Sequence, residues 1–192
     1  MPAIDAHTSA EPSSWIRRWA HLIPPGAAVL DVACGHGRHM RWLAQQGYPV
    51  TGVDRDADAV AAARRFGEVL QADIENGPWP LPGRRFSAVV VTNYLWRPLL
   101  PTLLARVEAG GVLIYETFAR GNETVGRPSR PDFLLQPGEL LRCCPEPAWR
   151  VVAYEDGFLP APERFVQRIA AVRSGSTAPG QEAAPARHLL TP

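Results

Sequence analysis

A short glycine-containing segment directly follows an apolar run near the start of the chain. Residues 27–32 are apolar except for Asp31, and they lead into Gly35 and Gly37. Glycines at this spacing permit a tight turn and let the backbone approach a bound molecule closely. A helix that begins after them presents unpaired amides to that molecule. The segment therefore predicts a site for a nucleoside-bearing cofactor.

Two further acids follow the next two apolar runs. Asp54 comes after residues 48–53, where its carboxylate is placed to accept hydrogen bonds from both hydroxyls of a ribose. Asp73 and Ile74 come after residues 69–72, where the acid is expected to bind an exocyclic amine and the isoleucine to cover an adenine face. In an open parallel sheet, ligands bind beyond the carboxyl ends of the strands. Three such features at successive strand ends point to a single cofactor site.

The charge of Asp31 discriminates between cofactors. A dinucleotide fingerprint requires a glycine three residues after its second glycine, where this chain has Met40. It would also set a pyrophosphate against the Asp31 carboxylate. The methionine end of S-adenosylmethionine carries an ammonium and a cationic sulfur, which an acid attracts. The sequence favours S-adenosylmethionine, and an NAD(P)-dependent oxidoreductase on the same architecture is the alternative.

With these residues the chain resembles the class I S-adenosylmethionine-dependent methyltransferases, and most closely the small bacterial type related to the tellurite-resistance group. The resemblance covers roughly residues 15–172. It rests on motif I at 29–39, motif II at 50–54, motif III at 71–74, motif IV at 86–94 and the strand-five segment at 110–114. Two departures stand out: Ala33 replaces the first glycine of motif I, and motif IV ends in Thr92-Asn93 without an acid. The missing acid argues against the Asn/Asp-Pro-Pro-Tyr motif of amino-methylating enzymes.

The resemblance also implies roles for individual residues. It places Asp31, Ala33, Gly35 and Gly37 around the methionine moiety with Arg38 at its carboxylate, Asp54 at the ribose, Arg55, Asp73 and Ile74 at the adenine, and Thr92 and Asn93 near the sulfonium. No metal site is expected, because Cys34, His36 and His39 match no usual zinc spacing.

The methyl acceptor is expected on the loops after the fourth and fifth strands. Tyr94 and Glu116 are the candidate catalytic residues there, although Tyr94 is equally suited to be a pocket wall and Glu116 to pair with an arginine of the following loop. That loop, 118–135, is long and lacks a helical period, and Arg127 and Arg130 within it predict an anionic acceptor. Transfer from a sulfonium is an in-line displacement, so the protein mainly aligns the reactants. The predicted activity is methyl transfer to a small, anionic molecule; a non-catalytic S-adenosylmethionine-binding module is the second alternative.

The elements that must position these residues are apolar runs alternating with helical patterns. Continuous apolar strands separated by helices predict a parallel sheet covered on both faces. We expect an α/β, Rossmann-like, doubly wound, mostly parallel sheet in three αβα layers. The expected strands are 27–32, 48–53, 69–72, 86–92 and 112–117, with a turn at 109–111, and 150–154 and 165–172 pairing antiparallel at one edge.

Length and composition limit the remaining possibilities. The chain has 192 residues, which suits one domain at 13–173 between a flexible segment 1–12 and a disordered segment 174–192. Its net charge of +1 argues against a nucleic-acid-binding surface, and no run approaches a membrane span. All 20 basic residues other than histidine are arginine, which excludes a Gly-Lys phosphate loop. Three cysteines form no disulfide framework, so a cytoplasmic protein acting on a small molecule is expected.

Overall fold

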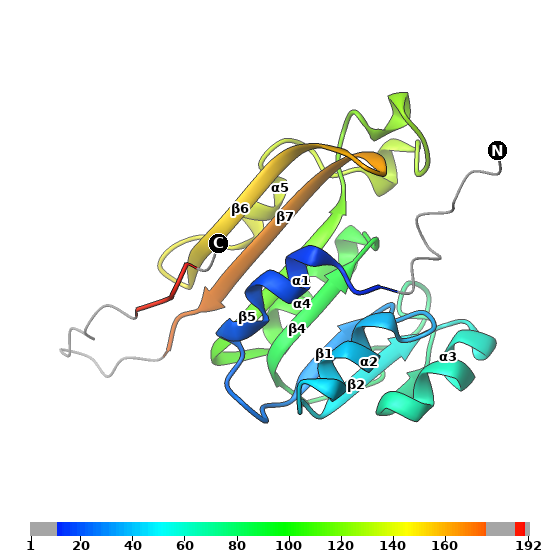
Figure 1. Cartoon of the computed structure of the whole chain (residues 1–192), viewed down its shortest axis with the longest axis vertical. Helices are drawn as coiled ribbons and strands as arrows, with labels where there is room; N and C mark the ends of the chain where they lie inside the picture. The colour runs from blue at the N-terminus through cyan, green and yellow to red at the C-terminus, as the bar shows by residue number, and fades with distance from the viewer. Residues whose placement is uncertain (1–10, 176–186, 191–192) are drawn as a thin grey trace.

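The computed structural model describes residues 11–175 and 187–190, which form a twisted sheet with helices on both sides (Figure 1). Most of the two predicted terminal segments, at 1–10, 176–186 and 191–192, lies outside the described residues. Residues 187–190 have no regular structure, and the carbonyl oxygen of Leu189 lies 2.9 Å from His21 Nε2. None of the helices within the described ranges is long and apolar enough to cross a membrane.

Seven strands form one sheet in the order β3-β2-β1-β4-β5-β7-β6. Their bounds are β1 Val29–Val32, β2 Val50–Asp54, β3 Glu68–Gln71, β4 Phe86–Thr92, β5 Val107–Phe118, β6 Trp149–Pro160 and β7 Glu163–Arg173. Strands β1 to β5 pair in parallel, whereas β7 is antiparallel to both β5 and β6. Successive strands are added first on one side of β1, as β2 and β3, and then on its other side, beginning with β4. This confirms the doubly wound sheet with an antiparallel edge.

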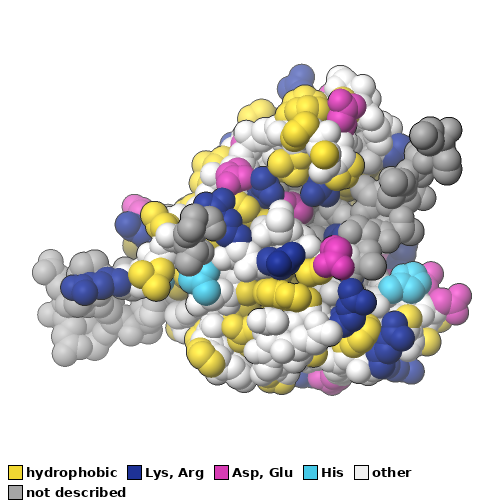
Figure 2. Space-filling model, in the orientation of Figure 1, with side chains coloured by type: hydrophobic (Ala, Val, Ile, Leu, Met, Phe, Trp, Pro, Cys, Tyr) yellow, Lys and Arg dark blue, Asp and Glu magenta, His cyan; other side chains and the backbone are white. Residues whose placement is uncertain are grey.

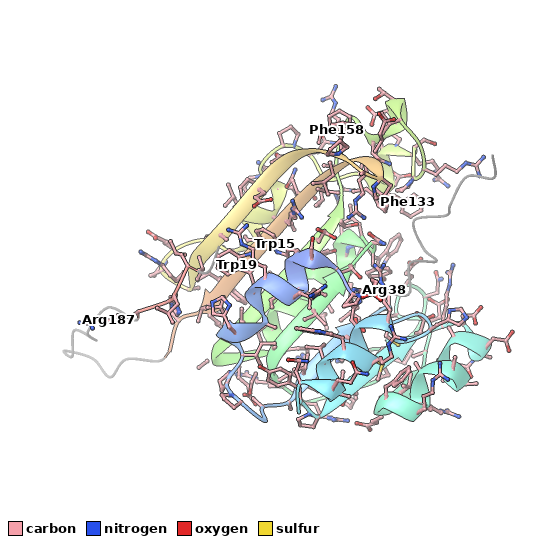
Figure 3. The ribbon with its side chains drawn as sticks, in the orientation of Figure 1. Trp15, Trp19, Arg38, Phe133, Phe158 and Arg187 are labelled. Carbon is pink, nitrogen blue, oxygen red and sulfur yellow. The ribbon has the colours of Figure 1, made fainter. Side chains whose placement is uncertain are left out.

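Helices cover the two faces of the sheet and give it two separate cores. The α-helices are α1 Ser14–Trp19, α2 Arg38–Gln45, α3 Ala57–Ala63, α4 Leu100–Arg106 and α5 Glu139–Cys143. Alternate residues of β4 belong to different cores, because side chains alternate between the faces of a strand. Val89 packs with Leu103 of α4, whereas Val90 packs with Leu43 of α2. Trp15 and Trp19 of α1 are buried on the same side as Val90 (Figure 3). The predicted three layers are therefore present.

Two of the helices begin at side-chain caps that the sequence signals. Ser13 caps α1, where its hydroxyl accepts a hydrogen bond from Trp15 N, and Asp56 caps α3, where its carboxylate accepts from Ala59 N. Short 3₁₀ turns follow or precede the helices at η1 Ala20–Leu22, η2 Arg64–Phe66 and η3 Arg97–Leu99.

The structure differs from the expectations at the strand-five turn and in the C-terminal part. Strand β5 runs through residues 109–111, where the predicted turn is instead a shift in pairing with β4 and Gly110 has φ +78°. Strands β6 and β7 form a longer hairpin than predicted. The segment 118–135 contains two 3₁₀ turns, η4 Asn122–Thr124 and η5 Pro131–Phe133, and is closed by a bridge between Ala119 and Leu135.

Candidate functional site

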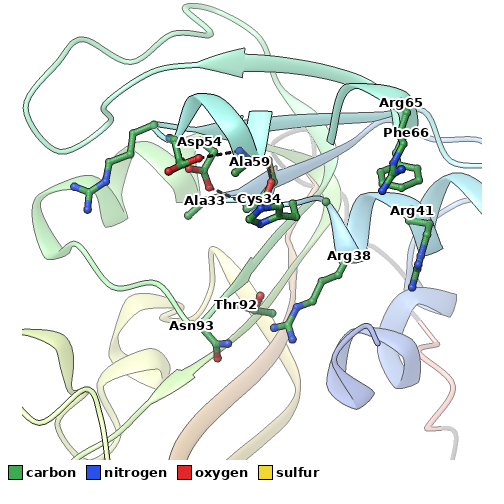
Figure 4. Close-up of a pocket in the computed structure, with 15 residues that line it drawn as sticks. Ala33, Cys34, Arg38, Arg41, Asp54, Ala59, Arg65, Phe66, Thr92 and Asn93 are labelled. Atoms are coloured by element: carbon green, nitrogen blue, oxygen red, sulfur yellow. Dashed lines mark hydrogen bonds between the residues drawn. The ribbon is translucent and has the colours of Figure 1, made fainter. Parts of the chain in front are cut away.

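Three neighbouring cavities lie at this end of the sheet, and the largest of the three, about 910 Å³, lies at the carboxyl ends of β1, β2 and β4 (Figure 4). It is the position that a doubly wound sheet offers to a ligand. Of the predicted cofactor residues, its walls include Ala33, Gly35, Gly37, Arg38, Asp54, Arg55, Thr92 and Asn93. The sequence motifs therefore meet at one place although they are distant along the chain.

The loop between β1 and α2 is bent by residues with positive φ. Ala33, Gly35 and Gly37 have φ of +52°, +53° and +78°. A Cβ built on Gly35 would meet no atom within 4 Å, so this glycine faces the open cavity. A Cβ built on Gly37 would lie 2.9 Å from the Cβ of Ala63, so glycine here lets α2 begin against α3. Gly35 thus leaves open space for a ligand, whereas Gly37 allows α2 to pack closely against α3.

Asp54 at the end of β2 braces that loop. Its Oδ2 accepts a hydrogen bond of 2.7 Å from Gly35 N, and its Oδ1 accepts one of 3.0 Å from Asp56 N. A carboxylate offers about four acceptor positions, so it retains capacity for ligand hydroxyls. The predicted contact with a ribose is compatible with this arrangement and stays a prediction.

Asp31 is a buried acid, and one of its two carboxyl oxygens lacks a hydrogen-bond partner among the described residues. The residue is 1% exposed, and Oδ2 has no hydrogen bond within the described part of the chain. Its nearest cationic candidate is His39, whose Nδ1 lies 4.0 Å away. Burial raises the pKa of Asp31 to about 8, against the opposing effect of Arg38. A cation delivered to this carboxyl would favour its charged form.

His39 connects motif I to the N-terminal helix. Its Nε2 accepts a hydrogen bond of 3.2 Å from Ser13 N, so the neutral ring carries its proton on Nδ1. That nitrogen faces Thr92 Oγ1 at 3.4 Å. Burial, with a further contribution from Arg38, lowers the pKa of His39 to about 3. His39 is therefore a neutral structural link, which the sequence analysis considered only as a metal ligand. Within the described residues, no group of three His, Cys, Asp or Glu side chains is arranged to hold a metal ion.

Arg38 is the cation of this cavity that points towards motif IV. Figure 4 shows its guanidinium directed to Thr92 and Asn93, and it forms no ion pair with another described residue. Asp31 and Arg38 thus stand before and after one glycine loop: Arg38 lines the cavity, whereas Asp31 is buried behind it with only the neutral His39 nearby. An amino-acid moiety carries the complementary ammonium and carboxylate, so S-adenosylmethionine fits these residues.

A smaller cavity of about 170 Å³ continues from Asp54 along the end of β3. It contains the predicted adenine residues Arg55, Asp73 and Ile74. Asp73 accepts hydrogen bonds from Asn76 Nδ2 and from the backbone amides of residues 75 and 76, which lower its pKa. Those bonds shape the turn that presents Ile74 to the cavity.

A third cavity, of about 310 Å³, lies beyond the ends of β4 and β5. Asn93 borders both this cavity and the largest one, whereas Tyr94 borders it and the smaller one. Asn93 adopts φ +54°, and its amide donates a hydrogen bond of 3.0 Å to the carbonyl of Glu116. The Tyr94 hydroxyl is buried, without a well-formed hydrogen bond to a described residue. Burial raises the pKa of Tyr94, and the nearby carboxylates of Glu75 and Asp73 raise it further.

The two arginines predicted to bind the acceptor are separated by the structure. Arg127 lines the third cavity. Arg130 is not among its lining residues: it forms a 3.0 Å ion pair with Asp132, and its side chain is 72% exposed. Its guanidinium also stacks over Phe133. Of the two arginines only Arg127 lines one of these cavities, and its contact with an acceptor stays a prediction.

Glu116 is buried beside the cavities within a network of hydrogen bonds and ion pairs. It is 2% exposed and accepts hydrogen bonds from Ser13 Oγ at 3.0 Å and from Arg168 Nη1 at 3.1 Å. Arg164 Nη2 lies 3.8 Å from Oε1. Both arginines come from β7, not from the loop 118–135, and Glu116 lines none of the three cavities. Sequence reasoning missed Glu75, which lines the second and third cavities.

Comparison with known proteins gives matches to methyltransferases. Residues 29–109 match the family model described as "Methyltransferase domain". Ribosomal protein L11 methyltransferase of Burkholderia thailandensis is 34% identical over 121 residues, covering 57% of this chain and 39% of that protein. The dTDP-3-amino-3,6-dideoxy-alpha-D-glucopyranose N,N-dimethyltransferase of Streptomyces fradiae is 40% identical over 83 residues, covering 42% of this chain and 31% of that protein. The chain thus spans less than two fifths of the length of these relatives.

A solved structure extends the likeness of the fold over most of the chain. TehB from Haemophilus influenzae superposes with a TM-score of 0.69 at 20% identity, covering 88% of this chain and 64% of that one. The glycine loop after β1, Asp54 and Asp73 all lie within the matched residues 29–109. Residues 29–109 thus match a methyltransferase domain, and over most of its length the chain has the fold of an S-adenosylmethionine-dependent methyltransferase.

Proposed function

We propose that this protein transfers a methyl group from S-adenosylmethionine to a small, anionic acceptor bound in the 310 Å³ cavity. The observation that carries the proposal is the junction at Asn93, which borders both the cofactor-sized cavity and the acceptor-sized cavity. A nucleophile in one and a methyl donor in the other would meet there. Arg127 supplies the acceptor cavity with a cation for an anionic group.

The chain's own residues account for holding the cofactor. Asp31 receives the ammonium, Arg38 the carboxylate and Asp54 the ribose. Arg55, Asp73 and Ile74 line the adenine cavity, and Thr92 and Asn93 border the place of the sulfonium. When bound, S-adenosylmethionine supplies a methyl group activated by a cationic sulfur. Alignment of the reacting atoms is then the main task of the protein.

The acceptor-side residues divide into a direct and an indirect role. Tyr94 keeps its proton at neutral pH, because its pKa is raised, so it orients an acceptor by donating a hydrogen bond. Glu116 positions Asn93 through its backbone carbonyl and holds Ser13 and Arg168. Leu95, Phe118 and Phe133 line the cavity with apolar surface that limits water.

The size of the cavity favours a small molecule over a macromolecule. By their names, one relative methylates a ribosomal protein and the other an amino-sugar nucleotide. A cavity of about 310 Å³ lies at the lower end of small-molecule sites. Basic and acidic side chains are interspersed on the face shown in Figure 2. The three cysteines are free, which supports a cytoplasmic location.

Incubation with methyl-labelled S-adenosylmethionine and a metabolite extract tests the proposal. We expect label in a small, anionic product. Arg127→Met should lower turnover at least tenfold while the affinity for S-adenosylhomocysteine is unchanged, since one charge-assisted contact is lost. Arg150→Met, at an exposed arginine of β6 that lines none of the three cavities, is the control and should retain wild-type turnover. Label in protein or RNA alone, or equal turnover by both variants, would refute the small-anion proposal.

A further inference from the structure

The acceptor cavity holds two opposite charges that do not pair with each other. Glu75 and Arg127 both line it, and neither forms an ion pair with another residue in the described part of the chain. Other charged residues around the loop are used differently. Arg97 binds Glu139 at 2.7 Å and donates to the carbonyls of Asp132 and Leu134, which fixes the loop. The loop is thus held by other residues, and the charges of Glu75 and Arg127 remain available to a ligand.

The rest of the lining of this cavity is mainly apolar. Leu95 and Phe118 are buried, and the rings of Phe118 and Phe133 line the cavity together with Pro128. Figure 3 shows Phe133 on the segment 119–135 and Arg38 at the start of α2, both at this edge of the sheet. The Tyr94 hydroxyl is also buried at this cavity, and its burial together with the neighbouring Glu75 carboxylate raises its pKa. The cavity therefore combines an acid, a base and an apolar wall.

We propose that the methyl acceptor is a small zwitterion with an apolar body, as in an amino acid with an aromatic side chain. Its carboxylate would bind Arg127 and its ammonium Glu75, while the body contacts Phe118 and Phe133. This inference rests on the proposed function and adds a second recognition group to the anionic one. It assigns to Glu75 a role in selecting the acceptor.

Alternative acceptors leave one charge unsatisfied. A simple anion would be repelled by the carboxylate of Glu75, and a simple cation would be repelled by the guanidinium of Arg127. A neutral apolar molecule would cover both charges without replacing their water, which is costly. A zwitterion satisfies both, so charge complementarity discriminates against all three alternatives.

Binding of three matched probes in the presence of S-adenosylhomocysteine tests this inference. L-Phenylalanine carries both charges, phenylacetate lacks the ammonium, and phenethylamine lacks the carboxylate. We expect calorimetry to show L-phenylalanine binding about tenfold more tightly than either of the others, since each lost contact to a charged group has about that effect. Glu75→Gln should abolish the preference over phenylacetate only, and Arg127→Met the preference over phenethylamine only. Arg150→Met, at an exposed arginine of β6 outside the cavity, should leave all three affinities unchanged.

The outcomes separate this inference from the proposed function. Equal binding of L-phenylalanine and phenylacetate to the wild-type protein would overturn the role of Glu75. So would a Glu75→Gln protein that weakens all three probes equally, since that result indicates a structural role. Binding of S-adenosylhomocysteine with none of the three probes would refute the zwitterion while leaving the methyltransferase proposal in place. Failure to bind S-adenosylhomocysteine would refute the proposed function itself.

Discussion

Asp31 and Glu116 are both buried carboxyl groups at the same edge of the sheet, and their surroundings are opposite. Asp31, near the end of β1, has Oδ2 unpartnered among the described residues and its pKa raised to about 8. Glu116, on β5, accepts hydrogen bonds from Ser13 and Arg168 and has Arg164 nearby. Burying an unpaired charge is costly, whereas a paired one holds its neighbours in place. The difference separates an acid that awaits a ligand from an acid that serves the structure.

The network around Glu116 joins elements that are distant in the chain. Ser13 links it to α1 and, through its amide, to His39 of α2. Arg168 links it to β7 and continues to Glu155 of β6 at 2.7 Å. The backbone N–H of Asn93 donates a hydrogen bond to the Glu116 carbonyl, so the same network also holds the backbone on the acceptor side of the site. Asp31 has no comparable set of partners among the described residues, and its side of the loop is completed by the cofactor in our proposal.

Removal of the Glu116 carboxylate should have the largest effect. Glu116→Ala leaves Arg164, whose side chain is 18% exposed, without an ion-pair partner among the described residues, and Arg168 with Glu155 alone, so we expect a loss of about 3 kcal/mol in the free energy of unfolding. Urea denaturation measures it. Asp132→Ala breaks an exposed ion pair and should cost no more than about 1 kcal/mol. Equal losses in the two variants would contradict the structural role of Glu116.

Removal of the Asp31 charge should have the opposite effect on the unliganded protein. The raised pKa means that the unfolded chain loses the Asp31 proton near pH 4, whereas the folded protein retains it to about pH 8. Wild-type stability therefore falls as pH rises through this window. Asp31→Asn removes the titration, so its advantage in thermal stability should grow between about pH 4 and about pH 8. An advantage that shrinks over this range would show that Asp31 is paired.

Asp31→Asn should also weaken the binding of the cofactor. A cationic ligand must draw the proton from Asp31, so wild-type affinity for S-adenosylmethionine should rise between about pH 6 and about pH 8. Asp31→Asn should bind about tenfold more weakly, with a flatter pH profile. Isothermal titration at several pH values measures both. An unchanged affinity would remove Asp31 from the cofactor site.

The cofactor-binding residues around Asp31 could be predicted from the sequence, whereas the partners of Glu116 could not. The glycine loop and the acids after β1, β2 and β3 are local patterns, in which each residue directly follows its own apolar run. The partners of Glu116 lie 103 and 52 residues away, and no local pattern signals such pairs. The position of Glu75 between two cavities depends in the same way on how β3 and β4 are placed. The turn predicted at 109–111 was wrong, because β5 pairs with β4 on both sides of Gly110 and the strand continues through these residues.

The backbone beside the two acids offers a smaller and sharper test. Ala33, two residues after Asp31, has φ +52°, and Asn93, bonded to the Glu116 carbonyl, has φ +54°. Asparagine tolerates this left-handed conformation, whereas alanine is strained in it by about 1–2 kcal/mol. Ala33→Gly should therefore stabilise the protein by about 0.5–1 kcal/mol, after the added entropy of the unfolded chain is subtracted. Asn93→Gly, the matched control, should give no gain. Urea denaturation compares the two, and a larger gain at Asn93 would place the strain on the Glu116 side of the site.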